Sequence, residues 1–540
     1  MQKRQYQRFD FYDYETTGVH SGYDQVVQFA GVSTDENLNI IKGSEANVIV
    51  RPRPDVVPSP MAFLTTNIDI NVLKQHGITE FELARYVQAR FMSNKGTCIS
   101  GYNTINFDDE LTRTLMFRNM KSSYDHEWKN NNGRADIFRL IQLTYAFFPN
   151  LIEFPEIDGK TTLKLEHLSK ANGIIHENAH DALSDVYATI ELAKMVKDRR
   201  ETLYDHFLNL SDKRNAANLL FDREPLFHVT SFFDRSYHST SLVQPIVVDG
   251  QNANKFHCID LRFDPSDVMS MSAEDIRKYL FTKREDLPEG SPKLPVASIQ
   301  TNKQPLLSPF KGTMNSELQQ RFQLDLDRVN KHKEILMSDP GFANRLQQAM
   351  MQEPMVAKDA FVSLYSGGFI DNNDAFERAK MHYVDQSSDG EMFRLENSDV
   401  YDVASTMKDA KRQSELLLRA KWNNFYERIL ASGEFSALEL SEWSKYLEER
   451  LYKGMGDEKA LTVSQFKQDI KEARLNNALT AEQDEILVAL ESHVKELEDL
   501  VVSLKEINQI LEKDGEALEN SNFEKINANN SGGLEPTIAR

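Results

Sequence analysis

Hydrophobic and polar positions follow two different periodicities over residues 1–200. Short apolar runs rich in β-branched and aromatic residues alternate with stretches of helical periodicity. Such alternation is typical of an α/β layered domain. The pattern predicts strands at residues 9–14, 25–34, 47–50 and 97–102 and helices at residues 80–93 and 181–194.

The pattern of hydrophobic and polar positions changes in the next part of the chain. Residues 201–353 mix short strand patterns, such as 245–248 and 256–261, with charged helical patterns such as 273–280. Short strands with helices between them that do not alternate regularly favour an α+β arrangement. We therefore expect a second domain over residues 201–353.

Long amphipathic patterns dominate from residue 354 onward. They predict a helical domain over residues 354–513. We expect residues 514–540, whose last part is rich in Asn, Ser and Gly, to be a disordered tail. The longest helical patterns are 403–425, 437–451 and 481–513.

The last of these helices carries an apolar stripe at strict four-three spacing. This spacing is the signature of a coiled-coil seam, but the same stripe can pack on neighbouring helices of its own domain. We favour packing within the domain, because a run of about four heptads is near the minimum for a coiled coil. The stripe consists of Ile486, Leu490, His493, Leu497, Leu500, Leu504, Ile507 and Leu511.

Composition excludes several classes of protein. Of the 540 residues, 40% are hydrophobic and 27% are charged, and this globular balance excludes a disordered, fibrous or membrane-embedded chain. The formal net charge of −20 argues against a protein that coats DNA over its whole surface. It leaves room for a nucleic-acid enzyme with one local basic groove.

Cysteine content and the N-terminus indicate a cellular compartment. Cys98 and Cys258 are too few for a disulfide framework or a zinc site, which favours a reducing environment. No apolar signal region opens the chain, and no run reaches the roughly 18 apolar residues of a membrane span. We expect a soluble, cytoplasmic protein that has no contact with a membrane.

Acidic residues recur at three points of the first domain. Asp13 and Glu15 are two residues apart in a predicted strand, so both side chains point to one face. Asp108 lies at the start of one helical stretch. His180 and Asp185 lie at the start of another, the helix predicted at residues 181–194. Carboxylate ligands with few nitrogens and no thiolates suit Mg²⁺ or Mn²⁺ rather than zinc.

Each of these features alone is commonplace. Paired acids on a strand are usually solvated, acids at a helix start are commonly caps, and a single histidine is most often an ordinary surface residue. The set is more specific than its members, because carboxylates that hold two metal ions about 3.5–4 Å apart can activate water for phosphodiester hydrolysis. A histidine can take the proton of that water.

Longer blocks around these residues carry a resemblance to a known family. Together they resemble the bacterial exonuclease I family, within the DEDD exonuclease superfamily and its histidine variant, and the resemblance extends to about residue 500. The blocks are DYETTG at 13–18, GYNTINFDDE at 101–110, LEHLSKANGI at 165–174, NAHDALSDVYAT at 178–189, FHVT at 227–230, LYSGGF at 364–369 and RAKWNNF at 419–425.

This resemblance implies a fold and an activity. The fold is an α/β RNase H-like exonuclease domain followed by an SH3-like α+β domain and a C-terminal helical domain, which together close the DNA path. The activity is 3′→5′ degradation of single-stranded DNA to 5′-mononucleotides by two-metal-ion hydrolysis, in DNA repair and recombination. It also implies that single-stranded DNA-binding protein is a partner, and we expect the chain to act as a monomer.

Site residues carry over from the family by position. Asp13, Glu15, Asp108 and Asp185 match the ligands of two Mg²⁺ ions, which Mn²⁺ can replace, and His180 matches the general base. Asp109 and Asp181 adjoin this set and are interpreted as helix-start residues.

Contacts to the terminal nucleotide are expected from two segments. Thr16 and Thr17 follow the first carboxylates, and Phe63 and Leu64 lie in the segment that seats the nucleotide in the family. Asn67 stands where the family has glycine, and Asn tolerates the left-handed conformation that glycine would adopt.

Residues 232–238 interleave aromatic and cationic side chains, as surfaces that bind single strands do. Arg235 and Tyr237 are the expected DNA contacts of this loop. Phe232 and Phe233 are either part of the same surface or core residues.

Three alternatives to this function stay open on the sequence. A relative that prefers RNA ends is one, although such enzymes are short chains without the domains that follow Asp185. A binding protein that has lost catalysis would lack at least one metal ligand, and none is missing. The helical C-terminus could also be an assembly element for which the nuclease is accessory.

Overall fold

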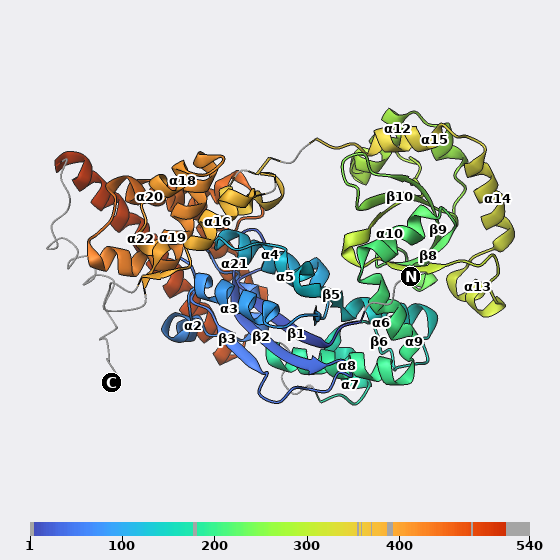
Figure 1. Cartoon of the computed structure of the whole chain (residues 1–540), viewed down its shortest axis with the longest axis horizontal. Coiled ribbons are helices and arrows are strands. Elements are labelled where there is room, and N and C mark those ends of the chain that lie inside the picture. Colours follow the sequence, from blue (N-terminus) through green and yellow to red (C-terminus); the bar gives the residue numbers. More distant parts are fainter. Residues whose placement is uncertain are drawn as a thin grey trace.

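A computed structural model gives the structure of the chain. It describes residues 5–175, 181–353, 356–357, 359–368, 370–385, 392–476 and 479–514. Figure 1 shows three parts along the long axis of the molecule. The N-terminal part lies between the other two, and the two flanking parts sit at opposite ends.

The N-terminal part is built on a five-stranded sheet with the order β3-β2-β1-β4-β5. The central strand β1 runs antiparallel to β2 and parallel to β4, and β4 runs parallel to β5. This mixed sheet confirms the predicted strands. The strands are β1 Arg8–Thr16, β2 Val26–Asp35, β3 Ala46–Ile49, β4 Thr97–Gly101 and β5 Gly133–Asp136.

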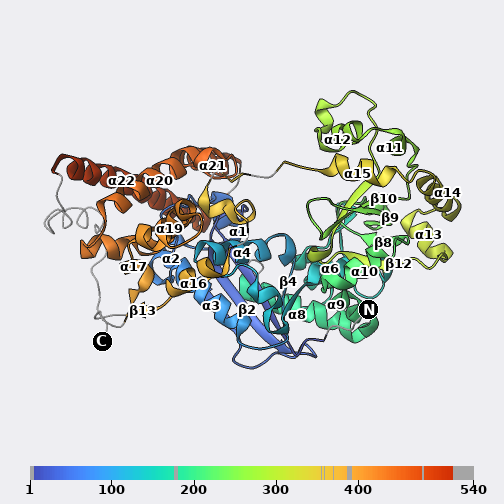
Figure 2. The ribbon, with the colours of Figure 1, turned by 45° about the horizontal axis from the view of Figure 1, so that its top comes forward.

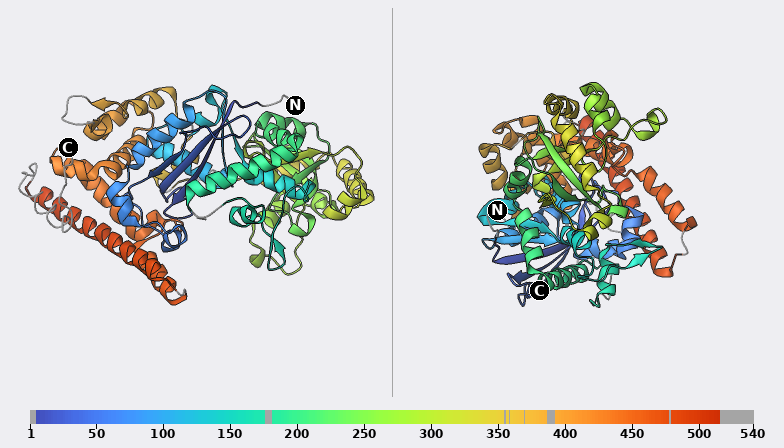
Figure 3. Two further views of the ribbon diagram at one scale, coloured as in Figure 1. Left: turned by 90° about the horizontal axis from the view of Figure 1, so that it is seen from below. Right: turned by 90° about the vertical axis from the view of Figure 1, so that its right-hand side faces the viewer.

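Alternation along β1 decides which helices cover each face of the sheet. Phe9 and Phe11 point to one face and pack in a buried cluster with Val186 of α8. Tyr12 and Tyr14 point to the other face and pack with residues of α3 and α4. Figure 3 shows α8 lying along the sheet. The helices and minor strands of this part are α1 Pro60–Thr66, α2 Ile70–His76, α3 Glu80–Met92, α4 Asp108–Arg118, α5 Asp125–Trp128, α6 Ile137–Phe147, β6 Glu156–Ile157, β7 Lys160–Thr161, α7 Leu165–Ala171 and α8 Ala182–Arg199.

The second part holds an antiparallel five-stranded sheet with the order β11-β10-β9-β8-β12. Gln304 joins this sheet to the first part, because its Oε1 accepts from the backbone N–H of Asp136 at 2.9 Å. Its Nε2 donates to the Phe207 carbonyl within the second part at 3.2 Å. The sheet and its helices agree with the predicted α+β arrangement. They are α9 Glu201–Leu210, α10 Lys213–Phe221, β8 Leu226–Val229, β9 Thr240–Val248, β10 Lys255–Asp260, α11 Ser266–Ser270, α12 Ala273–Phe281, β11 Val296–Gln300, β12 Leu306–Pro309, α13 Ser316–Phe322, α14 Leu326–Met337 and α15 Phe342–Met350.

The third part is helical, as predicted, with one difference. The single helix expected at 403–425 is two helices, α18 and α19, because the chain turns at Asp409, whose φ of 55° is left-handed. The turn lets α18 fold back and pack against α19. The elements are the 3₁₀ helix η6 Ala360–Tyr365, α16 Asn372–Lys380, β13 Val384–Asp385, β14 Met392–Phe393, α17 Arg394–Asn397, α18 Val400–Ser405, α19 Ala410–Ser432, α20 Ala437–Lys453, α21 Val463–Asn476 and α22 Ala481–Asp514.

The apolar stripe of α22 packs within the chain, on helices of its own part as predicted and also on two helices of the first part. Its described apolar members from Ile486 to Ile507 are buried in one cluster with residues of α1, α2, α20 and α21, and His493 is buried as well. Figure 2 shows α22 beside α20. The stripe is therefore explained by intramolecular packing. The side chain of Leu511 and the tail beyond residue 514 lie outside the described residues.

A buried charge network joins the first and third parts. Arg53 pairs with Asp55 at 2.8 Å and with Glu80 at 2.7 Å. The Asn423 amide and the Tyr446 hydroxyl, both from the third part, donate to Asp55 at 2.8 and 2.6 Å. Burial raises the pKa of Asp55, but the Arg53 guanidinium and the Tyr446 hydroxyl outweigh it and hold the pKa below its usual range. Donors from both parts of the chain therefore stabilise this buried charge.

Among the described helices, none combines the length and the apolar character needed to cross a lipid bilayer.

Candidate active site

Three carboxylates from two elements meet at one end of the first sheet. Asp13 and Glu15 lie on β1, on the face that Phe9 and Phe11 also occupy, and that face packs against α8. Asp185 lies in the first turn of α8. Ligand oxygens of Asp13, Glu15 and Asp185 all fall within 4.8 Å of one another. The pleat of β1 and the docking of α8 thus create a group that can hold a divalent cation.

Asp108 lies beside this group without belonging to it. It is the first residue of α4 and is 4% exposed. Its Oδ1 accepts a hydrogen bond from the backbone N–H of Tyr14 at 3.3 Å. Tyr14 is the residue between Asp13 and Glu15, so this bond holds Asp108 against that point of β1. Asp108, which the resemblance implied as a fourth metal ligand, therefore lies next to the other three carboxylates.

Electrostatics in this group disfavour the charged forms. Burial raises the pKa of Asp13 well above its usual value, and the charges of Asp108, Glu15 and Asp185 raise it further. Burial, followed by Asp185 and Asp108, raises the pKa of Glu15 to about 8. Clustered carboxylates of this kind are stabilised in their ionised state by a bound cation, and hard oxygen donors suit Mg²⁺ or Mn²⁺.

The neighbouring acids have structural partners. Asp181 is the N-cap of α8 and accepts from the backbone N–H of Ser184 at 3.3 Å. Asp109 accepts from the Tyr12 hydroxyl at 2.9 Å and pairs with Arg134. Both agree with their interpretation as helix-start residues. His180 lies outside the described residues, so its role stays a prediction.

A cavity of about 860 Å³ opens beside Asp185. Its walls come from the β6–β7 hairpin, the start of α7 and the loop of the second domain that contains residues 232–238. They carry the cations Lys160, Lys164 and Arg235. Arg235 Nη1 donates to the Thr161 carbonyl at 3.4 Å, which joins the loop to the hairpin. Sequence reasoning found Arg235 but missed both lysines. The signal for them was two cations flanking a threonine-rich segment.

Residues expected to seat the terminal nucleotide are largely engaged in the fold. The Thr16 hydroxyl donates to the Gly18 carbonyl at 2.7 Å, and the Thr17 hydroxyl donates to Asp24 at 3.0 Å. Phe63 and Leu64 are buried in the core that the first and third parts share. Their contact with a nucleotide stays a prediction.

Two loop features follow the expectations from sequence. Asn67 ends α1 with a φ of 56°, the left-handed conformation expected of it. In the second domain's loop, Phe232 is 94% exposed, so it is a surface residue, whereas Phe233 packs against a buried cluster. Tyr237 stacks under Arg262, whose guanidinium carbon lies 3.7 Å from the ring centre.

Family comparisons divide the chain in the same order as the structure. An exonuclease model matches residues 11–193, an Exonuclease I SH3-like domain matches 211–352, and an Exonuclease I C-terminal domain matches 358–497. Exodeoxyribonuclease I of Escherichia coli K12 is 32% identical over 496 residues, which cover 90% of this chain and 99% of that protein. The chain belongs to the exonuclease I family.

Other family members are similar over most of this chain. Exodeoxyribonuclease I of Haemophilus influenzae is 31% identical over 82% of this chain and 91% of that protein. The exonuclease I structure from Methylocaldum szegediense matches with a TM-score of 0.80 and 32% identity, over 91% of this chain and 99% of that one. E. coli exonuclease I in complex with a dA16 oligonucleotide matches with a TM-score of 0.79 and 28% identity, over the same shares.

Proposed function

We propose that this exonuclease I family member is a 3′→5′ exonuclease that degrades single-stranded DNA to 5′-mononucleotides, in DNA repair and recombination. The observation that carries the proposal is the group of Asp13, Glu15 and Asp185 at the edge of a cation-lined cavity. The E. coli enzyme has been solved with single-stranded oligonucleotides, which supports the same substrate class here.

The donor set fits divalent cations. Asp13, Glu15, Asp108 and Asp185 would hold two Mg²⁺ ions, with Mn²⁺ as a substitute. Such ions supply an activated water and neutralise charge on the leaving oxygen. The E. coli enzyme has been solved in a zinc-bound and in a metal-free form, which agrees with a site for a divalent ion.

The protein's own residues would bind and orient the strand. Lys160, Lys164 and Arg235 line the cavity and offer positive charge to the phosphate backbone. Tyr237, on the same loop as Arg235, offers an aromatic face, and Thr16, Thr17, Phe63 and Leu64 would shape the seat of the terminal nucleotide. His180 would take the proton from the attacking water.

Assignments beyond the reaction follow from the family. We assign the exonuclease domain to residues 1–200, the SH3-like domain to 201–353, the helical domain to 354–513 and a tail to 514–540. We propose a cytoplasmic monomer whose protein partner is single-stranded DNA-binding protein.

Digestion of a 5′-labelled strand tests the proposed function. Single-stranded DNA, the same sequence as RNA and a 3′-blocked DNA are incubated with Mg²⁺ and either the wild type or Asp185→Asn. We expect stepwise shortening of the unblocked DNA by the wild type alone. Shortening of RNA with DNA left intact would favour an enzyme of RNA ends, and inertness on both would leave a binding protein.

A further inference from the structure

A second cavity, of about 490 Å³, lies between the exonuclease domain and the helical domain. One wall is the C-terminal end of α4 and the loop that follows it, with Phe117 and Met120. The opposite wall is η6 and the start of α16, with Leu364 and Ile370. Its lining residues differ from those of the cavity beside Asp185. It is therefore a separate place in the molecule, large enough for a small ligand.

Two buried donors in its wall lack partners. Arg378 is 1% exposed, and its Nε and Nη2 donate to Gln413 Oε1 at 3.1 and 2.9 Å. Its Nη1 has no hydrogen-bond partner among the residues that the structure describes, and the same holds for the hydroxyl of Ser123, which is 4% exposed. Buried donors without partners cost free energy, so an acceptor in the cavity would stabilise both.

Positive charge is in excess around the cavity. Lys121 lines it, and burial together with the Arg85 guanidinium lowers the pKa of Lys121 to about 8. Of the nearby carboxylates, Asp125 pairs with Lys129 at 2.6 Å, and the charge of Asp374 beside Arg378 is opposed by the Arg412 guanidinium. In a chain with a net charge of −20, such a local excess favours an anionic ligand.

The side chains of the cavity walls indicate which kind of molecule carries this anionic group. Tyr124 is half-buried and offers an aromatic side chain, whereas Phe117 is 1% exposed and lies against Arg378 and Arg412, whose guanidinium carbons are 5.3 and 5.6 Å from its ring centre. Flat rings stack on such faces, while Arg and Lys bind phosphate oxygens.

We propose that this cavity binds a nucleoside 5′-monophosphate, with the phosphate near Arg378, Lys121 and Ser123 and the base against Tyr124 and the apolar side chains of Leu364 and Ile370. The choice of a mononucleotide rests on the proposed function, because that reaction releases 5′-mononucleotides.

A contact connects this cavity to the active site. The hydroxyl of Tyr365, which lines the cavity, donates to the carboxylate of Glu110. Glu110 lies in the first turn of α4, two residues after Asp108. A ligand in the cavity therefore lies against the helix that carries one of the active-site carboxylates.

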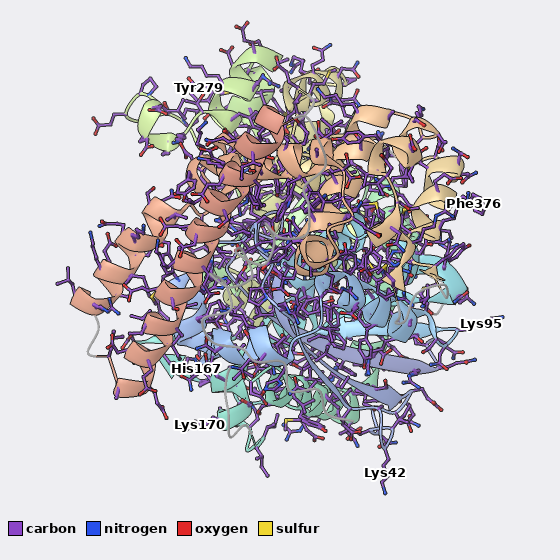
Figure 4. The ribbon with its side chains drawn as sticks, turned by 90° about the vertical axis from the view of Figure 1, so that its left-hand side faces the viewer. Lys42, Lys95, His167, Lys170, Tyr279 and Phe376 are labelled. Atoms are coloured by element: carbon purple, nitrogen blue, oxygen red, sulfur yellow. The ribbon has the colours of Figure 1, made fainter. Side chains whose placement is uncertain are left out.

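Equilibrium binding of dAMP to the full chain in EDTA tests the site, because without metal the active-site carboxylates repel the phosphate, and variants of this cavity separate its binding from any binding at the cations beside Asp185. Calorimetry should give one dAMP per chain, with deoxyadenosine at least tenfold weaker because it lacks the phosphate. Lys121→Gln should weaken dAMP at least tenfold, and Ala375→Phe, which fills the cavity from an exposed wall position, should abolish binding. Lys95→Gln, an exposed lysine of the same domain (Figure 4), is the matched control and should bind as the wild type does.

Arg378→Gln should weaken dAMP binding as well. If this substitution of a buried residue prevents folding, Lys121→Gln still tests the site. Equal dAMP affinity in the wild type and Lys121→Gln, or deoxyadenosine binding as tight as dAMP, would overturn the proposal. Digestion of labelled DNA is measured separately. A chain that shortens DNA but binds no dAMP in EDTA would refute this inference alone, whereas a chain that binds dAMP but leaves DNA intact would refute the proposed function.

Discussion

Asp13 on β1 and Asp185 on α8 bring their carboxylate oxygens within 4.8 Å of each other, with Glu15 completing the group. This proximity requires the sheet and the helix to be packed, since the two residues belong to distant segments. The first prediction follows from it. Asp185→Asn keeps the size of the side chain but removes a charged ligand, so we expect the rate of DNA shortening to fall by at least about 100-fold with the fold intact.

Asp198→Asn is the control for that change, because Asp198 lies exposed on the same helix. It should digest DNA as the wild type does. Similar rates for Asp185→Asn and Asp198→Asn would remove Asp185 from the site.

The pKa of Glu15 predicts how stability depends on pH without metal. Its folded-state pKa is raised from 4.5 to about 8, so the folded chain favours the protonated form. The stability that this preference contributes is present below the unfolded value and is lost as the pH rises toward the folded value. We expect metal-free Glu15→Gln to melt at a higher temperature than the wild type near pH 8, with the difference shrinking toward pH 5.

Mg²⁺ should stabilise the wild type more than Glu15→Gln and so reduce the difference between their melting temperatures. At pH 8 it should raise the melting temperature of the wild type more than that of Glu15→Gln, because the cation binds the ionised group. Thermal melts in EDTA and in Mg²⁺ measure both effects. A wild type that is the more stable of the two in EDTA at pH 8 would contradict the prediction.

Arg235 should contribute charge rather than sequence preference to DNA binding. We expect Arg235→Gln to weaken single-strand affinity by about three- to tenfold for every sequence and to lower the salt slope by about one unit. Lys42→Gln removes the same charge from an exposed lysine of the exonuclease domain that does not line the cavity beside Asp185 (Figure 4), and it should change neither. Fluorescence titrations at several salt concentrations in EDTA measure both quantities, and equal effects of the two substitutions would argue against a specific contact.

Tyr446 should be important for the joint between the exonuclease and helical domains. Tyr446→Phe removes the hydroxyl that donates to buried Asp55 at 2.6 Å. We expect a loss of about 1–3 kcal/mol in the free energy of unfolding, because the carboxylate loses a donor where water cannot replace it. Urea denaturation measures the loss. Tyr452→Phe, at a position that is 40% exposed, should have little effect, and a similar cost for both would refute the role of the network.

The stripe of α22 predicts a difference between two neighbouring apolar residues. Leu490 is fully buried whereas Val488 is 53% exposed. We expect Leu490→Ala to cost about 2–5 kcal/mol and Val488→Ala to stay within about 0.5 kcal/mol. Light scattering should give one molecular mass for both variants and the wild type, since the stripe packs within the chain. A mass that falls only in Leu490→Ala would instead indicate a seam between chains.

Much of the fold could be predicted because local periodicity reports burial. The strands β1 and β2, the helices α3, α8 and α20 and the helical character of the third domain all appear where the pattern of apolar positions predicts them. The break between α18 and α19 could not be predicted, because both segments are amphipathic and only their mutual packing requires the chain to turn at Asp409.

The sequence by itself determined the chemistry of this protein: the oxygen ligands, their order along the chain, and the shared face of Asp13 and Glu15, which follows from the pleat of one strand. Tertiary structure alone decided which segments meet. It brought Asp185 to that face, turned the side chains of Thr17 and Phe63 inward, placed Lys160 and Lys164 on the cavity wall and gave the α22 stripe its partners. The physical reason is that local sequence patterns record whether a position is buried, whereas the partner that buries it comes from distant parts of the chain.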